Sequence, residues 1–234
     1  MTIDAILFDK DGTLVDFHGT WDVAIGRALR VATDSPAALA TAADALGYDL
    51  TSGTVLRSSP FVAESNEVVF ALLADHLDTD RFEAEATKAS LEEVAPAVGV
   101  EATLRELQAR AISCAVVTND YESIARSQMA VLGWEQFFAA QTGSDSGFGA
   151  KPEPGMVTGT LGLLQNTAVG PIRPSNAVMV GDTSHDLYAG NAAGLHTVLV
   201  TNGVEIAVEV RALAGTVIVD MSALIPALEA AGLL

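Results

Sequence analysis

Short apolar runs alternate with amphipathic stretches along most of the chain. The runs are rich in Val and Ile and are bounded by Gly, Asp, Asn or Thr, which is typical of buried parallel strands. They predict strands at residues 3–8, 111–118, 137–142, 177–182, 196–200 and 216–220. The stretches between them predict helices at 122–132, 154–164, 186–193 and 222–231. Alternating strands and helices favour a doubly wound α/β fold with a parallel sheet.

Residues 17–95 break this alternation. Their apolar residues recur at helical spacing, as in Trp21, Ile25 and Leu29, and no convincing strand interrupts them. The segment is too long for a crossover between two strands. We therefore predict an inserted all-helical domain at 17–95 and an α/β core at 1–16 and 96–234, with linkers near 15–18 and 92–100.

Composition narrows the class of protein. The chain of 234 residues has 12 basic and 30 acidic residues, and its formal net charge is −18. This balance argues against nucleic acid and anionic membranes as partners, because both require clustered Lys and Arg. No apolar stretch reaches the roughly 18 to 20 residues of a membrane span, and the N-terminus does not resemble a signal peptide. We expect a soluble cytoplasmic protein; its oligomeric state stays open.

The lone cysteine, Cys114, excludes an intrachain disulfide and a structural zinc site built from cysteines. It lies within an apolar run, so we expect a buried thiol.

Two acids end the first predicted strand. Asp9 and Asp11 stand at the carboxyl end of that strand, which is the edge where open α/β sheets bind ligands. Gly12 and Thr13 follow, and the group suggests a cation site. A calcium loop does not fit, because it needs Gly at its sixth and Glu at its twelfth position, whereas the twelfth residue from Asp9 is Thr20. A solvated turn is the remaining alternative for these residues alone.

Four motifs in order give the chain a resemblance to the haloacid dehalogenase-like hydrolase superfamily. The first is D-x-D-G-T-L at 9–14, and the second is the strand end V-V-T-N with Thr118 and Asn119. The third is K-P-E-P with Lys151, one of only three lysines, and the fourth is G-D-T-S-H-D with Asp182 and Asp186. The resemblance implies a Rossmann-like core and identifies the insertion as a helical cap.

The resemblance also implies a chemistry and a metal. Asp9 attacks phosphorus and forms an aspartyl-phosphate, and an ordinary carboxyl pKa of about 4 leaves it ionised without a base. Mg²⁺ is held by the Asp9 carboxylate, the Asp11 carbonyl and the Asp182 carboxylate, while Asp186 orients this shell through hydrogen bonds. The cation and Lys151 offset the repulsion between Asp9 and a phosphate dianion.

Three further positions receive roles in the same way. Asp11 protonates the leaving oxygen and then accepts a proton from water. Thr118 and the backbone N–H of Asn119 bind phosphoryl oxygens, although a strand-end Thr alone is more often a cap. The roles of Lys10 and His18 stay open between catalysis and packing.

These inferences favour a Mg²⁺-dependent phosphatase acting on a small phosphorylated metabolite, with phosphoglycolate as the favoured substrate. The alternative is a phosphosugar mutase, which shares the same core. The hypothesis of a non-catalytic binding protein of the same superfamily is weaker, because none of the catalytic positions has been lost. The resemblance disfavours dehalogenation, because dehalogenases of this superfamily need no metal and lack the second Asp, whereas this chain has Asp11 and Asp182. Arg57 is the cap residue we assign to a substrate carboxylate, against the alternative of a solvated surface arginine.

Overall fold

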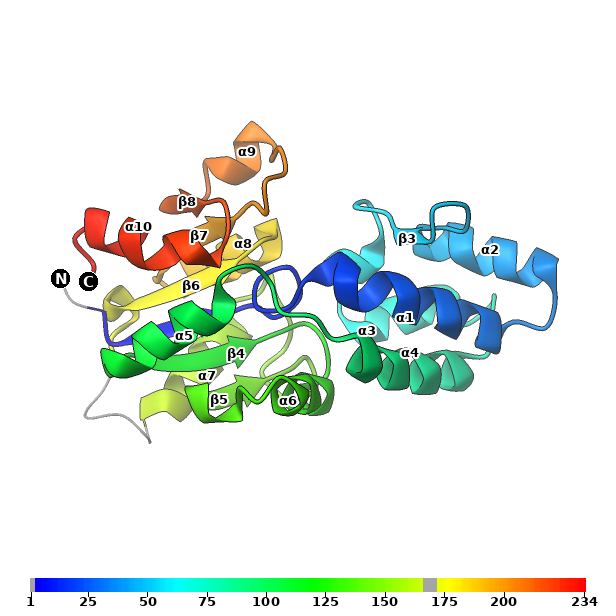
Figure 1. Cartoon of the computed structure of the whole chain (residues 1–234), viewed down its shortest axis with the longest axis horizontal. Helices are drawn as coiled ribbons and strands as arrows, with labels where there is room; N and C mark the ends of the chain where they lie inside the picture. Colours follow the sequence, from blue (N-terminus) through cyan, green and yellow to red (C-terminus); the bar gives the residue numbers. More distant parts are fainter. Residues whose placement is uncertain (1–2, 166–171) are drawn as a thin grey trace. The chain divides into compact units, whose positions relative to one another are not determined.

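The computed structural model describes residues 3–165 and 172–234 and divides the chain into two compact units (Figure 1). The core unit comprises Met1–Val15 and Pro96–Leu234, and the inserted unit comprises Asp16–Ala95. The sequence places these boundaries at 16/17 and 95/96.

A six-stranded parallel sheet forms the centre of the core unit, in the order β5-β4-β1-β6-β7-β8. The chain builds outward from β1 through β4 and β5, and then in the other direction through β6, β7 and β8. This order confirms the predicted doubly wound fold. The strands are β1 Ala5–Phe8, β4 Ser113–Val117, β5 Phe138–Thr142, β6 Ala177–Gly181, β7 His196–Val200 and β8 Thr216–Ile218.

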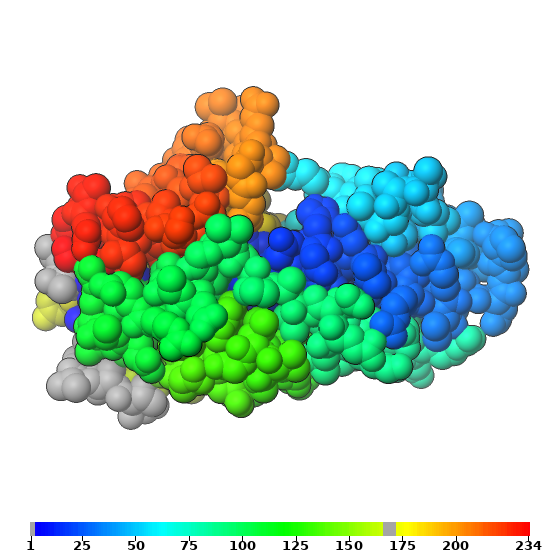
Figure 2. All heavy atoms as spheres, viewed as in Figure 1, coloured from blue at the N-terminus to red at the C-terminus, as the bar shows by residue number. Residues whose placement is uncertain are grey.

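Helices cover both faces of this sheet. Ala5 and Leu7 point to the face that packs against Met156, Val157 and other side chains of α7. Because strand residues alternate, Ile6 and Phe8 point to the opposite face. In the space-filling view of Figure 2, α5 and α10 (green and red) hide the central strands on that side. The helices are α5 Val100–Ala109, α6 Glu122–Val131, α7 Gly155–Gln165, α8 Ser184–Ala192, α9 Val208–Arg211 and α10 Leu224–Ala230.

Several predicted bounds shift for local reasons. β4 begins at Ser113 because Ala111, at φ 56°, belongs to the turn after α5. α8 begins at Ser184, two residues before the predicted start, because Thr183 caps it. The chain has four 3₁₀ turns among the described residues: η1 Pro60–Val62, η2 Glu135–Phe137, η3 Pro174–Asn176 and η4 Met221–Ala223.

Four helices build the inserted unit around their own apolar cluster, which includes Trp21, Ile25, Leu29, Leu46 and Phe82. They are α1 Phe17–Ala32, α2 Pro36–Leu46, α3 Asn66–Leu73 and α4 Thr79–Glu93. Across the described part of the chain, no helix has both the length and the apolar character needed to cross a membrane.

The prediction that the inserted domain is all-helical needs a correction. β2 Tyr48–Asp49 pairs antiparallel with β3 Thr54–Val55 in a small hairpin. The Asp49 carboxylate accepts hydrogen bonds from Thr51 N at 2.8 Å and Ser52 Oγ at 2.8 Å, and Gly53 takes φ +73°, so the turn closes locally. Strands of two residues are too short to show a period of two, and the sequence pattern misses them.

Candidate active site

The predicted core residues gather at one edge of the sheet. Asp9, Thr118 and Asp182 directly follow β1, β4 and β6, which are neighbours in the sheet. Lys151 comes from the loop between β5 and α7. Ligands bind at this carboxyl edge in open α/β sheets, near the point where the winding reverses.

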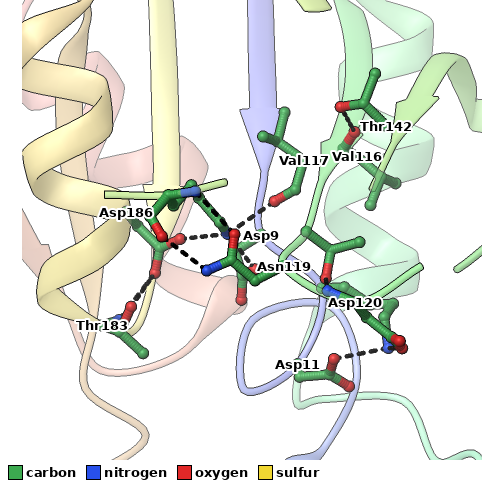
Figure 3. A network of polar contacts seen from close by, with 12 residues as sticks. Asp9, Asp11, Val116, Val117, Asn119, Asp120, Thr142, Thr183 and Asp186 are labelled. Atoms are coloured by element: carbon green, nitrogen blue, oxygen red, sulfur yellow. Dashed lines mark hydrogen bonds and ion pairs between the residues drawn. The ribbon is translucent and has the colours of Figure 1, made fainter. Parts of the chain in front are cut away.

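Lys151 joins the acids of the site. Its ammonium donates to Asp9 Oδ1 at 2.5 Å, to Asp186 Oδ1 at 2.6 Å and to the Val117 carbonyl at 2.8 Å (Figure 3). The side chain is 3% exposed. Burial alone would lower the pKa of Lys151, but the Asp186 and Asp9 carboxylates raise it above its ordinary value. The ammonium is therefore a fixed positive charge beside Asp9.

Asn119 anchors Lys151 through its side chain. Its Nδ2 donates to the Lys151 carbonyl at 2.9 Å, and its Oδ1 accepts from the Lys151 N–H at 2.8 Å. The sequence assigns a role to the Asn119 backbone N–H, which stays a prediction, and misses the side-chain contacts. Spacing cannot reveal them, because they join loops more than thirty residues apart.

Asp9, Asp182 and Asp186 form an acidic cluster in which one carboxylate oxygen of each lies within 4.8 Å of the others. Burial raises the pKa of Asp9 to about 7, with further raising by Asp186 and opposition from Lys151. This corrects the expectation of an ordinary carboxyl pKa at Asp9, which took no account of burial. Burial, with the charges of Asp9 and Asp186, also raises the pKa of Asp182 well above its usual value.

The cluster fits a hard divalent cation. Oδ1 of Asp182 is buried and has no hydrogen-bond partner among the described residues, so this oxygen is available as a ligand. Carboxylate oxygens are the ligands that Mg²⁺ prefers. The arrangement supports a metal site at Asp9 and Asp182, and the backbone carbonyl of Asp11 as a further ligand stays a prediction.

Asp186 has both oxygens engaged by protein donors. Oδ1 accepts from Lys151, and Oδ2 accepts from Thr183 N at 3.0 Å and Thr183 Oγ1 at 2.8 Å. The latter contacts form a capping box at the start of α8. These bonds suit a residue that orients its neighbours, which is the role that the sequence predicts for it.

Two glycines make room for the acids. A Cβ on Gly12 would lie 2.2 Å from Asp182 Oδ2, and Gly12 has φ +81°. A Cβ on Gly181 would lie 2.2 Å from Asp186 Cγ. Neither contact is tolerable, so both positions need glycine for the acids to stand where they do.

Asp11 and Thr118 also have protein partners. Asp11 Oδ2 lies 2.7 Å from the ammonium of Lys10, which is fully buried. Thr118 Oγ1 accepts from Asp120 N at 3.1 Å, so the hydroxyl caps a turn as well as standing at the site edge. From the sequence, the role of Lys10 stays open between catalysis and packing, and Asp120 is not identified as a site residue. The one sequence signal for this pair is a lysine at the end of a buried strand, a place that favours an apolar residue.

Arg57 and His18 belong to the inserted unit. Arg57 is exposed on the turn after β3, and its assignment to a substrate carboxylate stays a prediction. His18 lies in the first turn of α1, where Nδ1 is 3.1 Å from Asp22 Oδ1.

Comparison with known proteins identifies the family. The family model for haloacid dehalogenase-like hydrolases matches residues 3–194, which include all four motifs and the inserted unit. The chain belongs to the haloacid dehalogenase-like hydrolase family. This confirms the resemblance seen in the sequence.

Relatives within this hydrolase family narrow the class of enzyme. The phosphoglycolate phosphatase of Psychrobacter arcticus is 28% identical over 225 residues, covering 94% of this chain and 93% of the relative. That of Xanthomonas campestris pv. campestris strain 8004 is 30% identical over 207 residues, covering 83% and 81%. Membership and these relatives indicate a phosphatase.

A solved structure supports the fold of this family member. A candidate beta-phosphoglucomutase from Thermotoga maritima has a TM-score of 0.70 at 18% identity, over 97% of this chain and 99% of that one. At this identity the likeness concerns the fold alone.

Proposed function

We propose that this chain hydrolyses phosphoric monoesters through a covalent intermediate on Asp9. The observation that carries the proposal is the buried contact of 2.5 Å between Asp9 Oδ1 and the Lys151 ammonium, at the ligand-binding edge of the sheet. A fixed cation beside a carboxylate suits a site in which an anion must approach a phosphate dianion.

In this proposal, side chains of the protein carry out two successive nucleophilic displacements at phosphorus. An Asp9 oxygen attacks phosphorus as the bond from phosphorus to the leaving oxygen breaks, and Asp11 gives that oxygen a proton. In the second step, Asp11 takes a proton from water, whose oxygen attacks phosphorus and releases phosphate from Asp9. Thr118 and the Asn119 N–H bind the phosphoryl oxygens, and Lys151 offsets their charge.

The metal we propose is Mg²⁺, held by the carboxylates of Asp9 and Asp182 and the backbone carbonyl of Asp11. The Oδ1 atom of Asp182, which has no hydrogen-bond partner within residues 3–165 and 172–234, supports this set. When bound, the ion supplies positive charge to the phosphoryl oxygens. Asp186 orients the site through its bonds to Lys151 and Thr183.

For the substrate we propose a small phosphorylated metabolite bearing a carboxylate, of the phosphoglycolate type. The names of the relatives support this class, and one feature of the inserted unit agrees with it. Arg27, Arg81 and Lys88 form ion pairs within that unit, and Arg30 donates to the Gly26 carbonyl. Arg57 is the cation of residues 16–95 that no such contact engages, so it is available to a carboxylate.

The proposed function is tested by phosphate release from a panel of phosphorylated metabolites with Mg²⁺ present. We expect turnover of phosphoglycolate, and a loss of several orders of magnitude in Asp9→Asn, because an amide does not attack phosphorus. A fluoroberyllate mimic of the phosphoryl group should be found on Asp9. An adduct on another residue, or turnover that survives in Asp9→Asn, contradicts the mechanism. Interconversion of sugar phosphates without phosphate release would instead identify a mutase.

A further inference from the structure

Lys10 is a buried cation outside the Lys151 network. Its ammonium lies 2.7 Å from Asp11 Oδ2 and 3.1 Å from Asp120 Oδ2, and it donates to Gln128 Oε1 at 2.7 Å. The side chain has no exposed surface. These partners come from the loop after β1, the loop after β4 and helix α6. In Figure 3 the Asp11 carboxylate points toward Asp120, and the dashed line that leaves it is its ion pair with the Lys10 ammonium.

Two acids pair with the Lys10 ammonium: the carboxylates of Asp11 and Asp120 both lie within ion-pair distance of it. Its backbone is held as well, because the Lys10 carbonyl accepts from the N–H groups of Leu14 at 2.8 Å and Val15 at 2.9 Å. Lys10 therefore offers a charge at a fixed place, and the Asp11 side chain, 17% exposed, lies against it.

Stability alone does not account for this arrangement. A buried ion pair is often no more stabilising than apolar side chains of the same volume, because both charges lose their hydration. The residues before it in β1, Ala5–Phe8, are all apolar and buried, so an apolar side chain would suit the end of this strand. What an apolar side chain would not supply is a directional partner for Asp11.

We propose that Lys10 is a positioning residue that fixes the orientation of the Asp11 carboxyl for proton transfer to the leaving oxygen. The proposal rests on the proposed function, in which Asp11 is the acid. Asp120 and Gln128 hold the ammonium from its other sides, so the position of Asp11 is tied to the β4 loop that carries Thr118 and Asn119. Proton transfer is sensitive to such placement, because an error of about 1 Å can cost roughly a hundredfold in rate.

The choice of leaving group separates positioning from a structural role. An alkoxide needs a proton as it leaves, whereas p-nitrophenolate leaves without one, so only the first depends on Asp11 as an acid. In Lys10→Met we expect kcat/KM for the best alkyl phosphate of the panel to fall by roughly ten- to a hundredfold. For p-nitrophenyl phosphate we expect a fall of less than about threefold. Equal losses on both esters, or no loss on either, would overturn the proposal.

Two further variants keep the test decisive. Asp120→Asn keeps an amide oxygen that can accept from the Lys10 ammonium, and Gln128 still holds that ammonium, so Lys10 stays beside Asp11. The ratio of alkyl to aryl turnover should therefore keep the wild-type value. Lys10→Met combined with Asp120→Asn leaves no unpaired acid at position 120, and it replaces the single variant if that one does not fold. This double variant should show the same selective loss on alkyl phosphates.

A crystal structure of the Lys10→Met protein gives a readout independent of activity. We expect the Asp11 carboxyl to leave the orientation that it has in the wild type. An unchanged, well-ordered Asp11 contradicts the positioning role whatever the substrate. If the wild type hydrolyses neither ester, the proposed function fails, and this structure still decides whether Lys10 positions Asp11.

Discussion

At the scale of single residues, Asp182 is partly buried, and its Oδ1 atom is fully buried with no hydrogen-bond partner in the described structure. Its raised pKa means that folding disfavours the charged form, so an ionised Asp182 destabilises the protein at neutral pH unless a cation is bound. An ionised Asp182 therefore lowers the stability of the metal-free protein, whereas a bound cation would compensate its charge.

We predict that Asp182→Asn raises the melting temperature in a chelating buffer at pH 7.5 and abolishes the rise that Mg²⁺ gives the wild type. The neutral amide removes a negative charge that burial and the neighbouring Asp9 and Asp186 disfavour. We expect a gain of about 1–3 kcal/mol, and each kcal/mol shifts the melting temperature by roughly 2–4 °C in a chain of this size. Thermal melts with and without Mg²⁺ measure both effects. A lower melting temperature of the variant in chelator, or an intact Mg²⁺ response, would contradict the metal site.

Lys151 is the opposite case, a buried cation that compensates two acids. We predict that Lys151→Met lowers kcat by several orders of magnitude, because the lost charge serves the phosphoryl transition state as well as binding. It should also reduce the free energy of unfolding by about 3–5 kcal/mol, since Asp9 and Asp186 lose their partner. Steady-state kinetics and urea denaturation measure the two effects.

The matched control is Lys88→Met, which removes an exposed lysine whose nearest acid, Glu92, is 4.0 Å away. It should leave both quantities unchanged. A change confined to KM in Lys151→Met would show that Lys151 only attracts the substrate.

At the scale of elements, the central strands were predictable and their partners were not. Buried parallel strands such as β6 and β7 are continuous apolar runs, so the pattern finds them. Asp9 was found from its place at the carboxyl end of β1, whereas Asp182 was identified through the fourth motif of the family resemblance. The anchoring of Lys151 by Asn119 and of Lys10 by Gln128 depends on side chains brought together by tertiary structure, which no local pattern encodes.

The burial of β4 gives a prediction at this scale. Cys114 is 3% exposed, and burial raises the pKa of its thiol to about 12. Because the thiolate is the reactive form, the native protein should react with a thiol reagent at pH 8 roughly a thousandfold more slowly than the urea-unfolded chain. Absorbance of the released reagent measures both rates. Comparable rates in the two states would show that β4 opens readily or is not buried.

At the scale of the whole molecule, the net charge of −18 and the acidic cluster set the problem of anion recognition. In the core unit, Lys151 and Lys10 form ion pairs with acids of that same unit. Our proposal assigns neither lysine to a substrate carboxylate. Selectivity for such a group must therefore come from another cation. The sequence leaves Arg57 open between a contact with the substrate and a solvated surface arginine. The structure adds that the other Lys and Arg side chains of residues 16–95 have partners within their own unit.

We predict that Arg57→Ala lowers kcat/KM for phosphoglycolate by roughly ten- to a hundredfold, which corresponds to the loss of a charge-assisted pair of about 1.5–3 kcal/mol. Hydrolysis of p-nitrophenyl phosphate, which lacks a carboxylate, should change far less. Arg81→Ala is the matched control, because Arg81 is an exposed arginine of the same unit that pairs with Asp34 at 3.3 Å, and it should affect neither ester. Equal losses on both esters in Arg57→Ala would assign that residue to folding of the inserted unit. Unchanged phosphoglycolate turnover in Arg57→Ala would contradict the assignment of Arg57 to the substrate carboxylate.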